Sequence, residues 1–249
     1  MKVKTLACLC ALAVASAFGT EAVTSANTFG VLKVTCSAQK VIIATPWVEC
    51  LTAGNVKVTD LVMTSGLADG DAILVYQNGA FKSWAISGGA WTETLVSQAG
   101  ATVSSGDAAS EAIARGQAFW FVKASYSAPY DIYLYGQESA TASATSTIAA
   151  GTSAAPVYSL VASPSVATNN LNSATFSFTP NAADEIRMPR YNLPDLIYTY
   201  KAEQGWGTEV KVQIGSTGRY KKTWQAGCLI PPGKGFWYVS KGGSGTITW

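Results

Sequence analysis

Short runs of branched and aromatic residues, separated by polar turns, recur along most of the chain. The segment AILVYQNGAFKSWAI places Asn78 and Gly79 between two apolar runs, which is the strongest short-range signal for a β-hairpin. In RGQAFWFV and PGKGFWYV, consecutive side chains are apolar. Because side chains alternate along a strand, both faces of these strands are expected to be covered. The core positions expected from these two segments are Phe119, Phe121, Phe236 and Tyr238.

Similar segments occur twice in the same order. The first series is GVLKV, DAILVY, RGQAFWFV and YDIYLYG, and the second is VYSLV, DLIYTY, PGKGFWYV and GTITW. This comparison aligns Asp71 with Asp195. We therefore predict an all-β protein with two similar antiparallel domains in tandem, of the β-sandwich or β-barrel-like kind, at residues 28–137 and 156–249.

The segments that precede and join these domains have different compositions. Residues 138–155 are almost all Ala, Ser, Thr and Gly, which is the composition of a linker. Residues 1–22 combine Lys2 and Lys4, an apolar run and an Ala-x-Ala site ending at Ala17, which is the pattern of a secretory signal peptide. The alternative is a membrane helix, but the apolar run is shorter than the roughly 18 to 20 residues that spanning requires. The pattern predicts a secreted or cell-surface protein.

The order of these motifs resembles a known group of proteins. GVLKVT, an Asp-led DAILVY or DLIYTY strand, a Trp-bearing hairpin and RGQAFWFV or PGKGFWYV are similar to uncharacterised secreted β-repeat proteins of bacteria of the planctomycete and verrucomicrobial group. The resemblance covers most of residues 30–249. It implies the β fold and export, and it carries over no catalytic residues. The second copy departs from the first through its longer YKAEQGWGTEVKVQIGSTGRYKKTW segment.

Three cysteines remain after removal of the signal peptide, and export makes disulfide bonds available to them. Cys36 and Cys50 both lie in the first copy, and the matching regions of the second copy contain neither. We predict a Cys36–Cys50 disulfide, which would close a loop of about fifteen residues and stabilise the fold by about 3 kcal/mol. Cys228 is predicted to lack a partner in its own chain. The alternative is three buried, reduced thiols.

The composition excludes several kinds of function. A net charge of +2 provides no field for nucleic acid, so no nucleic-acid partner is expected. The chain has no histidine, which removes Ser-His-Asp and Cys-His catalysis and histidine ligands for zinc or copper. No glycine-rich nucleotide motif is present. The sequence therefore predicts no cofactor, no metal and no catalytic residues.

Carboxylates are the remaining candidates for chemistry. Glycoside hydrolysis needs two of them about 5 to 10 Å apart, but acids such as Asp131 and Glu209 lie in no distinctive motif. Asp69 and Asp71 in LADGDAI could supply oxygen ligands to calcium, although the further ligands of an EF-hand are missing. A turn leading into a strand is the favoured interpretation. We therefore predict that the protein is not an enzyme.

Two hypotheses about function remain. Only 13% of the residues are charged, against about 25% in ordinary soluble domains, and together with the repeated β units this favours a non-catalytic structural or cell-surface protein that can self-assemble. The alternative is a carbohydrate-binding module that uses aromatic side chains near glycine-rich turns as platforms for sugar rings. The predicted platforms are Trp84, Trp91, Trp206 and Trp224. The expected partners are further copies of the chain or a cell-surface polymer.

Overall fold

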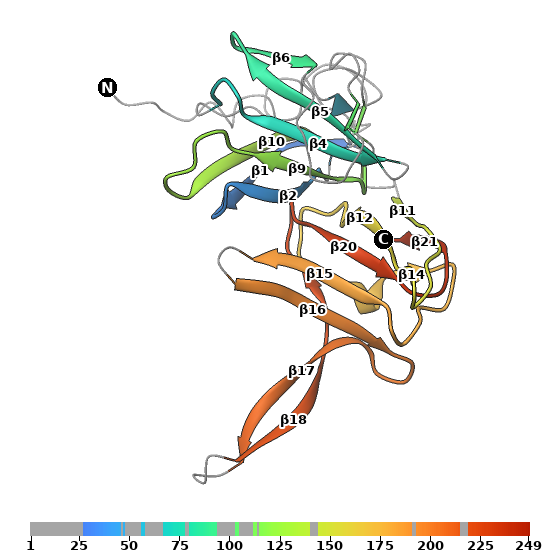
Figure 1. Cartoon of the computed structure of the whole chain (residues 1–249). Coiled ribbons are helices and arrows are strands. Elements are labelled where there is room, and N and C mark those ends of the chain that lie inside the picture. The colour runs from blue at the N-terminus through green and yellow to red at the C-terminus, as the bar shows by residue number, and fades with distance from the viewer. Residues whose placement is uncertain are drawn as a thin grey trace, which may run out of the picture.

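A computed structural model shows a chain made almost entirely of strands (Figure 1). It describes residues 27–45, 47, 56–57, 67–77, 80–93, 103–104, 112–113, 115–139, 144–190, 193–214 and 219–249. Within these ranges the only helical element is a short 3-10 turn, η2 (Leu171–Ser173). The all-β prediction is confirmed, and the sheets are antiparallel apart from one short parallel pair.

The first half of the chain contains one large sheet and two strand pairs. Its strands are β1 (Asn27–Cys36), β2 (Lys40–Ala44), β3 (Val56–Lys57), β4 (Ala72–Gln77), β5 (Ala80–Ser87), β6 (Ala90–Glu93), β7 (Val103–Ser104), β8 (Ala112–Ile113), β9 (Ala118–Val122) and β10 (Tyr130–Ser139). The large sheet has the order β2-β9-β4-β5-β6, with β7 beside β5, while β1 pairs with β10 and β3 with β8. The β4–β5 pairing, with Gln77 opposite Ala80, confirms the predicted hairpin.

The second half contains a larger set of strands. They are β11 (Thr145–Ile148), β12 (Val157–Ala162), β13 (Asn169–Asn170), β14 (Thr175–Phe176), β15 (Glu185–Arg190), β16 (Leu193–Lys201), β17 (Gly205–Ile214), β18 (Arg219–Ala226), β19 (Leu229–Ile230), β20 (Gly235–Ser240) and β21 (Gly245–Thr248). The large sheet has the order β12-β20-β15-β16-β17-β18. A second sheet has the order β11-β21-β14, and β13 pairs with β19.

The two halves pair their strands in a matching order. The order β2-β9-β4-β5-β6 corresponds to β12-β20-β15-β16-β17, and the pairs β1–β10 and β3–β8 correspond to β11–β21 and β13–β19. Ile43 lies opposite Phe119 in the first half, and Val161 lies opposite Phe236 in the second. All four predicted aromatic core positions are buried.

The strand order corrects one alignment made from the sequence. Ile73 pairs with Phe121, and Ile186 pairs with Tyr238, so Asp184 matches Asp71 directly before the equivalent strand. Asp195 instead lies exposed in β16, which is the second strand of the β15–β16 hairpin. The sequence comparison favoured DLIYTY because that segment is more apolar. The true counterpart, β15 (EIRMPR), has charged side chains on one face and therefore lacks the usual sequence pattern of a strand.

Asp71 and Asp184 are buried carboxylates with closely similar roles. Asp71 accepts hydrogen bonds from the backbone N–H groups of Ala68 and Ala124, at 2.9 and 2.8 Å, and from Nζ of Lys123. Asp184 accepts from the N–H groups of Asn181 and Lys241, at 2.9 and 2.7 Å, and from the hydroxyl of Tyr238 at 2.8 Å. Each carboxylate therefore joins a tight turn to the segment that follows a buried strand, which is β9 in the first half and β20 in the second.

Part of the segment whose composition predicted a linker belongs to a sheet. Four residues of the range 138–155 form β11, which pairs with β21. Ser146 and Ile148 alternate inward, and Ile148 joins the core of the second half. A short strand of small polar residues lacks the branched and aromatic enrichment that identifies strands in a sequence. Its pairing with the end of the chain is a tertiary contact.

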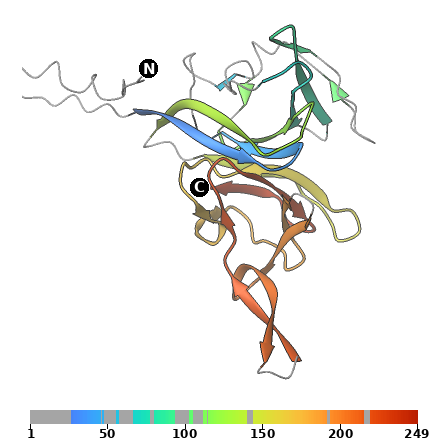
Figure 2. The same cartoon turned by 90° about the vertical axis from the view of Figure 1, so that its left-hand side faces the viewer.

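The two halves pack against each other through matching elements (Figure 2). The N–H of Ala44 donates to the carbonyl of Gly233 at 3.0 Å, and the N–H of Ala162 donates to the carbonyl of Gly116 at 3.1 Å. The side chains buried between the halves are Ile42, Ala44, Ala118 and Ala162, with Trp120, Leu160 and Trp237 packed around them. The contact is thus reciprocal, as in a two-fold pair.

The hairpin formed by β17 and β18 extends well beyond the rest of the large sheet as a two-stranded ribbon (Figures 1 and 2). We call this ribbon, residues 208–225, the arm. Near its tip Val212, Ile214 and Tyr220 are exposed, with 47%, 53% and 62% of their surface accessible. Both faces of the arm therefore meet solvent.

The described cysteines, Cys36 and Cys228, are both buried and are not bonded to each other. Cys50 lies outside the described residues, as does the predicted signal peptide, so the Cys36–Cys50 disulfide stays a prediction. Across the described ranges, no helix has the length and apolar character needed to cross a membrane.

Candidate functional site

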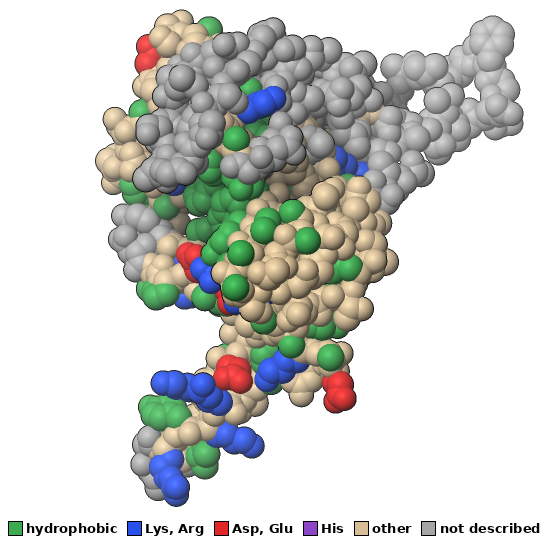
Figure 3. Space-filling view, turned by 45° about the vertical axis from the view of Figure 1, so that its right-hand side comes forward, with side chains coloured by type: hydrophobic (Ala, Val, Ile, Leu, Met, Phe, Trp, Pro, Cys, Tyr) green, Lys and Arg blue, Asp and Glu red, His purple; other side chains and the backbone are tan. Residues whose placement is uncertain are grey.

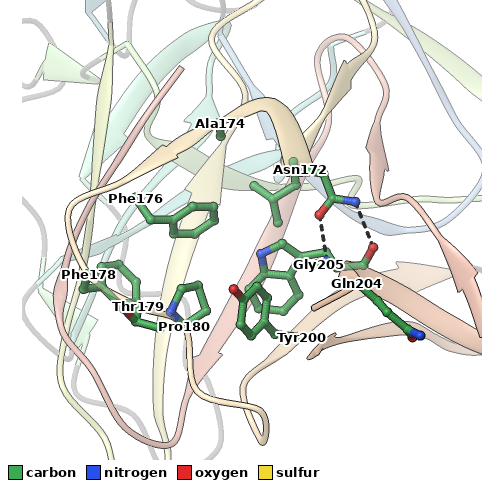
Figure 4. Close-up of a pocket in the computed structure, with 11 residues that line it drawn as sticks. Asn172, Ala174, Phe176, Phe178, Thr179, Pro180, Tyr200, Gln204 and Gly205 are labelled. Carbon is green, nitrogen blue, oxygen red and sulfur yellow. Dashed lines mark hydrogen bonds between the residues drawn. The ribbon is translucent and has the colours of Figure 1, made fainter. Parts of the chain in front are cut away.

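An aromatic pocket opens on the surface of the second half (Figure 4). Its volume is about 430 Å³, and it lies between the loop that follows η2 and the turn that joins β16 to β17. The rings of Phe176, Pro180 and Tyr200 surround one open space in Figure 4. The other aromatic side chains that line it are Phe178 and Trp206.

Trp206 is the centre of an aromatic cluster at this pocket. Its ring is stacked on Phe176, with centroids 6.3 Å apart and planes inclined by 29°. Tyr200 lies 5.5 Å from the same indole, and Tyr238 packs edge-on at 5.6 Å. The indole of Trp206 is fully buried by these neighbours, whereas Phe176 and Tyr200 are half-buried and present surface to the pocket.

The backbone of Trp206 is fixed by Asn172, which lies in η2 on the opposite side of the pocket. Oδ1 of Asn172 accepts from the N–H of Trp206 at 2.7 Å, and Nδ2 of Asn172 donates to its carbonyl at 3.0 Å (Figure 4). Gly205 makes this approach possible, because a Cβ there would lie 2.7 Å from Oδ1 of Asn172 and its φ is +70°. The amide side chain thus holds the two walls of the pocket together.

The polar groups at the pocket are uncharged. Asn172, Thr179 and Gln204 are exposed at its edge, and the described lining residues include no Lys, Arg, Asp or Glu. Nε1 of Trp206 is a buried donor that has no hydrogen-bond partner within the protein. The site can therefore pack against a flat apolar surface and exchange hydrogen bonds with neutral groups, but it offers no counter-charge to an ion.

The structure separates the four tryptophans that were predicted as platforms. Trp84 and Trp206 have 0% and 1% of their surface exposed, so neither is an open platform, and that part of the prediction is wrong. Trp91 and Trp224 are half-buried, and Nζ of Lys201 covers the ring of Trp224 at 4.1 Å from its centroid. Only Trp206 lines the pocket. Closeness to a turn did not imply exposure, because the strand pairs beside these turns direct alternate side chains into the core.

Of the residues that line the pocket, only Trp206 was predicted from the sequence, so Tyr200 and Asn172 were missed as well as two phenylalanines. Phe176 and Phe178 lie in the polar segment NNLNSATFSFTP, and they alternate with Ser177. Alternation of aromatic and small polar residues signals one apolar face, and this could have identified them. The sequence could not predict the packing partner of this segment, because its strand β14 pairs with the distant strand β21.

The chain was also compared with the requirements of a metal site and with known proteins. Over the residues that the structure describes, no group of three or more His, Cys, Asp or Glu side chains gathers in a way that could hold a metal ion. Comparisons of the chain with protein-family models, with curated proteins and with solved structures gave no match.

Proposed function

We propose that the protein is a non-catalytic secreted or cell-surface protein that binds a neutral carbohydrate in the aromatic pocket of its second half. The observation that carries the proposal is the combination of aromatic walls with a polar, uncharged edge. A sugar ring has an apolar face of C–H groups and a rim of hydroxyl groups, and these two surfaces match the two kinds of group at the pocket. The size of the pocket falls within the range of about 300 to 1,000 Å³ that small-ligand sites occupy.

The aromatic side chains have different roles in this proposal. Phe176 and Tyr200 are half-buried and supply the faces on which a sugar ring would stack. Trp206 lies beneath them and holds Tyr200 and Phe176 in place through ring contacts. Thr179 and Gln204, at the edge, would exchange hydrogen bonds with ring hydroxyls. Specificity would therefore come from the edge and affinity from the stacked faces.

A glycan-array screen of the secreted protein, followed by calorimetry on the best ligand, tests the proposal. Tyr200→Ala is expected to weaken binding by at least about tenfold, because it removes a stacking face at the centre of the site. Tyr200→Phe keeps the ring and should bind nearly as well as the native protein. Tyr220→Ala, on the arm, is the matched control and should leave affinity unchanged.

Two results would contradict this function. One is an array on which no glycan binds the folded protein, and the other is binding that Tyr200→Ala leaves intact. Circular dichroism of each variant shows whether lost binding reflects a lost site or a lost fold.

A second candidate function, self-assembly at the cell surface, is supported by the arm. Val210, Val212 and Ile214 alternate along β17 and therefore share one face, where the last two are exposed. Apolar side chains gather on this projecting ribbon beside Lys and Arg side chains (Figure 3). An isolated two-stranded ribbon is at best marginally stable in water, so a partner surface that covers this face would stabilise it.

The charge distribution favours a second copy of the chain as that partner. Residues 156–249 carry nine Lys and Arg against five Asp and Glu, whereas residues 28–137 carry six against eight. Four of the cations lie on the arm: Lys211, Arg219, Lys221 and Lys222. Cations on the edge strand β18 oppose edge-to-edge pairing. We infer that the arm of one copy contacts the more acidic first half of the next copy. The contact would use the face of the arm that carries Val212 and Ile214.

Sedimentation and electron microscopy of the secreted protein test this assembly. The double variant Val212→Ser/Ile214→Ser should shift the protein to monomers, while Val166→Ser, at another exposed aliphatic position away from the arm, should not. Added salt should weaken the assembly, because exposed charges are screened over about 10 Å at 0.1 M ionic strength. A native protein that stays monomeric at all concentrations contradicts it, and so does assembly that survives the double variant.

A further inference from the structure

A second cavity, of about 520 Å³, lies between the two halves and differs chemically from the aromatic pocket. Its walls come from the start of β2 in the first half, and from the β15–β16 hairpin and the approach to β20 in the second. The apolar residues that carry the argument are Val41, Ile42, Met188, Leu193 and Leu196. The described lining residues include no aromatic side chain, so the cavity is shaped by flexible aliphatic groups.

Three cations line this cavity without a carboxylate among the described lining residues. They are Lys40 at the start of β2, Arg190 at the end of β15, and Lys234 just before β20. Lys234 is half-buried, and its Nζ donates to the backbone carbonyl of Thr35 at 3.1 Å. Burial lowers the pKa of the Lys234 ammonium, because the charged form loses contact with water there. A negative group in the cavity would compensate that loss.

The cavity is a property of one side of the contact between the halves. In the matched strand pairs β2–β9 and β12–β20, Lys40 corresponds to Tyr158. Tyr158 packs edge-on against Trp237, with centroids 6.0 Å apart, and Tyr76 packs against the same ring at 5.5 Å. The corresponding place on the other side is thus occupied by aromatic rings. The aliphatic, cationic cavity is therefore not a necessary result of the way the halves pack.

We propose that this cavity binds an anionic amphiphile, namely an unbranched aliphatic carboxylate of the fatty-acid class. Its aliphatic chain would lie along Leu193, Leu196 and Met188, where it replaces water on apolar surface. Its carboxylate would meet Arg190 and Lys234, which supply charge-assisted hydrogen bonds. Leu193 has 59% of its surface exposed, so bound chain would also cover an otherwise open apolar side chain.

Titration of the full secreted protein with dodecanoate, followed by calorimetry, tests the proposal. We expect saturable binding with one site, and weaker binding by at least about tenfold for dodecanol, which lacks the charge. Arg190→Gln should weaken dodecanoate binding by a similar factor. Leu196→Ser should weaken dodecanoate and dodecanol together, because it alters the wall that contacts the chain.

Lys222→Gln is the matched control, because it removes one cation from the arm and should leave dodecanoate affinity unchanged. Arg190 is exposed, so its substitution is expected to leave the fold intact, which keeps the test informative if changes at the half-buried Lys234 impair folding. The proposal is overturned if dodecanoate fails to bind, if dodecanol binds equally well, or if Arg190→Gln and Leu196→Ser bind dodecanoate like the native protein. None of these outcomes bears on carbohydrate binding at the aromatic pocket.

Discussion

Trp91 in the first half and Trp206 in the second occupy matching positions in the strand order but different surroundings. Trp91 lies opposite Ile86 across a turn that contains Gly88 and Gly89. Trp206 lies opposite Tyr200, two positions beyond the pair formed by Ile186 and Tyr198. Trp91 is half-buried, whereas Trp206 is enclosed by Phe176, Tyr200 and Tyr238.

This difference shows that two matching strand positions can have very different surroundings. Strand pairing sets the direction of each tryptophan side chain. The residues around that side chain decide whether a pocket forms beside it. Aromatic side chains at Phe176 and Tyr200 provide walls beside Trp206, and Asn172 in η2 fixes its backbone. The glycine turn beside Trp91 offers no side chain of that kind. We therefore place the proposed carbohydrate site at Trp206 and not at Trp91.

Removing either buried carboxylate should have the largest effect on stability. Asp71→Ala and Asp184→Ala each remove the acceptor of three hydrogen bonds. Each should lower the free energy of unfolding by about 3 to 5 kcal/mol. Denaturant titration measures both, and Asp195→Ala, at an exposed position, should change stability by less than about 0.5 kcal/mol. If Asp195→Ala is the damaging change, the matching of Asp71 with Asp184 is mistaken.

Replacing each of the two matched tryptophans by alanine should lower the free energy of unfolding by different amounts in the two halves. Trp206→Ala removes a fully buried indole and should lower the free energy of unfolding by about 3 to 5 kcal/mol. Trp91→Ala removes a half-buried ring, and we expect a loss of about 1 to 2 kcal/mol. The two values come from the same denaturant titrations. Equal losses would mean that the surroundings of the two rings differ less than described.

Two matched glycines at the contact between the halves should respond unequally to alanine. Gly116 and Gly233 have φ values of +84° and +70°, so alanine is strained by about 1 to 2 kcal/mol at either position. At Gly233 the new Cβ would also lie 2.5 Å from Cγ2 of Val34, while at Gly116 the closest atom is Oγ of Ser146 at 3.3 Å. Thermal unfolding should therefore show a larger loss for Gly233→Ala, by about 1 to 3 kcal/mol. A reversed order would refute this account of the contact.

The two described cysteines should react slowly with alkylating reagents in the folded protein. This prediction concerns reactivity and not stability. Burial raises the pKa of the Cys36 thiol to about 11 and also raises that of Cys228. Brief iodoacetamide treatment at pH 8 should leave both unlabelled, and labelling should follow denaturation and reduction. Peptide mapping by mass spectrometry measures each site. Rapid labelling of Cys228 in the folded protein would contradict its burial.

The same mapping without reduction tests the predicted disulfide. A peptide that links Cys36 to Cys50 would establish the bond, and a linked peptide that contains Cys228 would exclude the assignment. Cys36 that is unlinked and becomes alkylated after denaturation alone would favour the alternative of reduced, buried thiols.

The sequence by itself determined the features that depend on local pattern. The hairpin at Asn78 and Gly79, the doubly covered strands around Phe119 and Phe236, and the all-β character were all readable in short windows. In each case the relevant physics is local: the preference of an Asn-Gly pair for a hairpin turn, and the alternation of side chains along a strand. The doubled order of segments was also visible, although its alignment at Asp195 was not correct.

Only the tertiary structure decided which residues meet. The place of Asp184, the pairing of β11 with the last strand, and the burial of Trp84 and Trp206 all depend on contacts between segments far apart in sequence. Strand register and burial are set by the partner strand, and no local pattern records which partner that is. For the same reason neither cavity could be predicted, because each is lined by residues from segments that only the folded chain brings together.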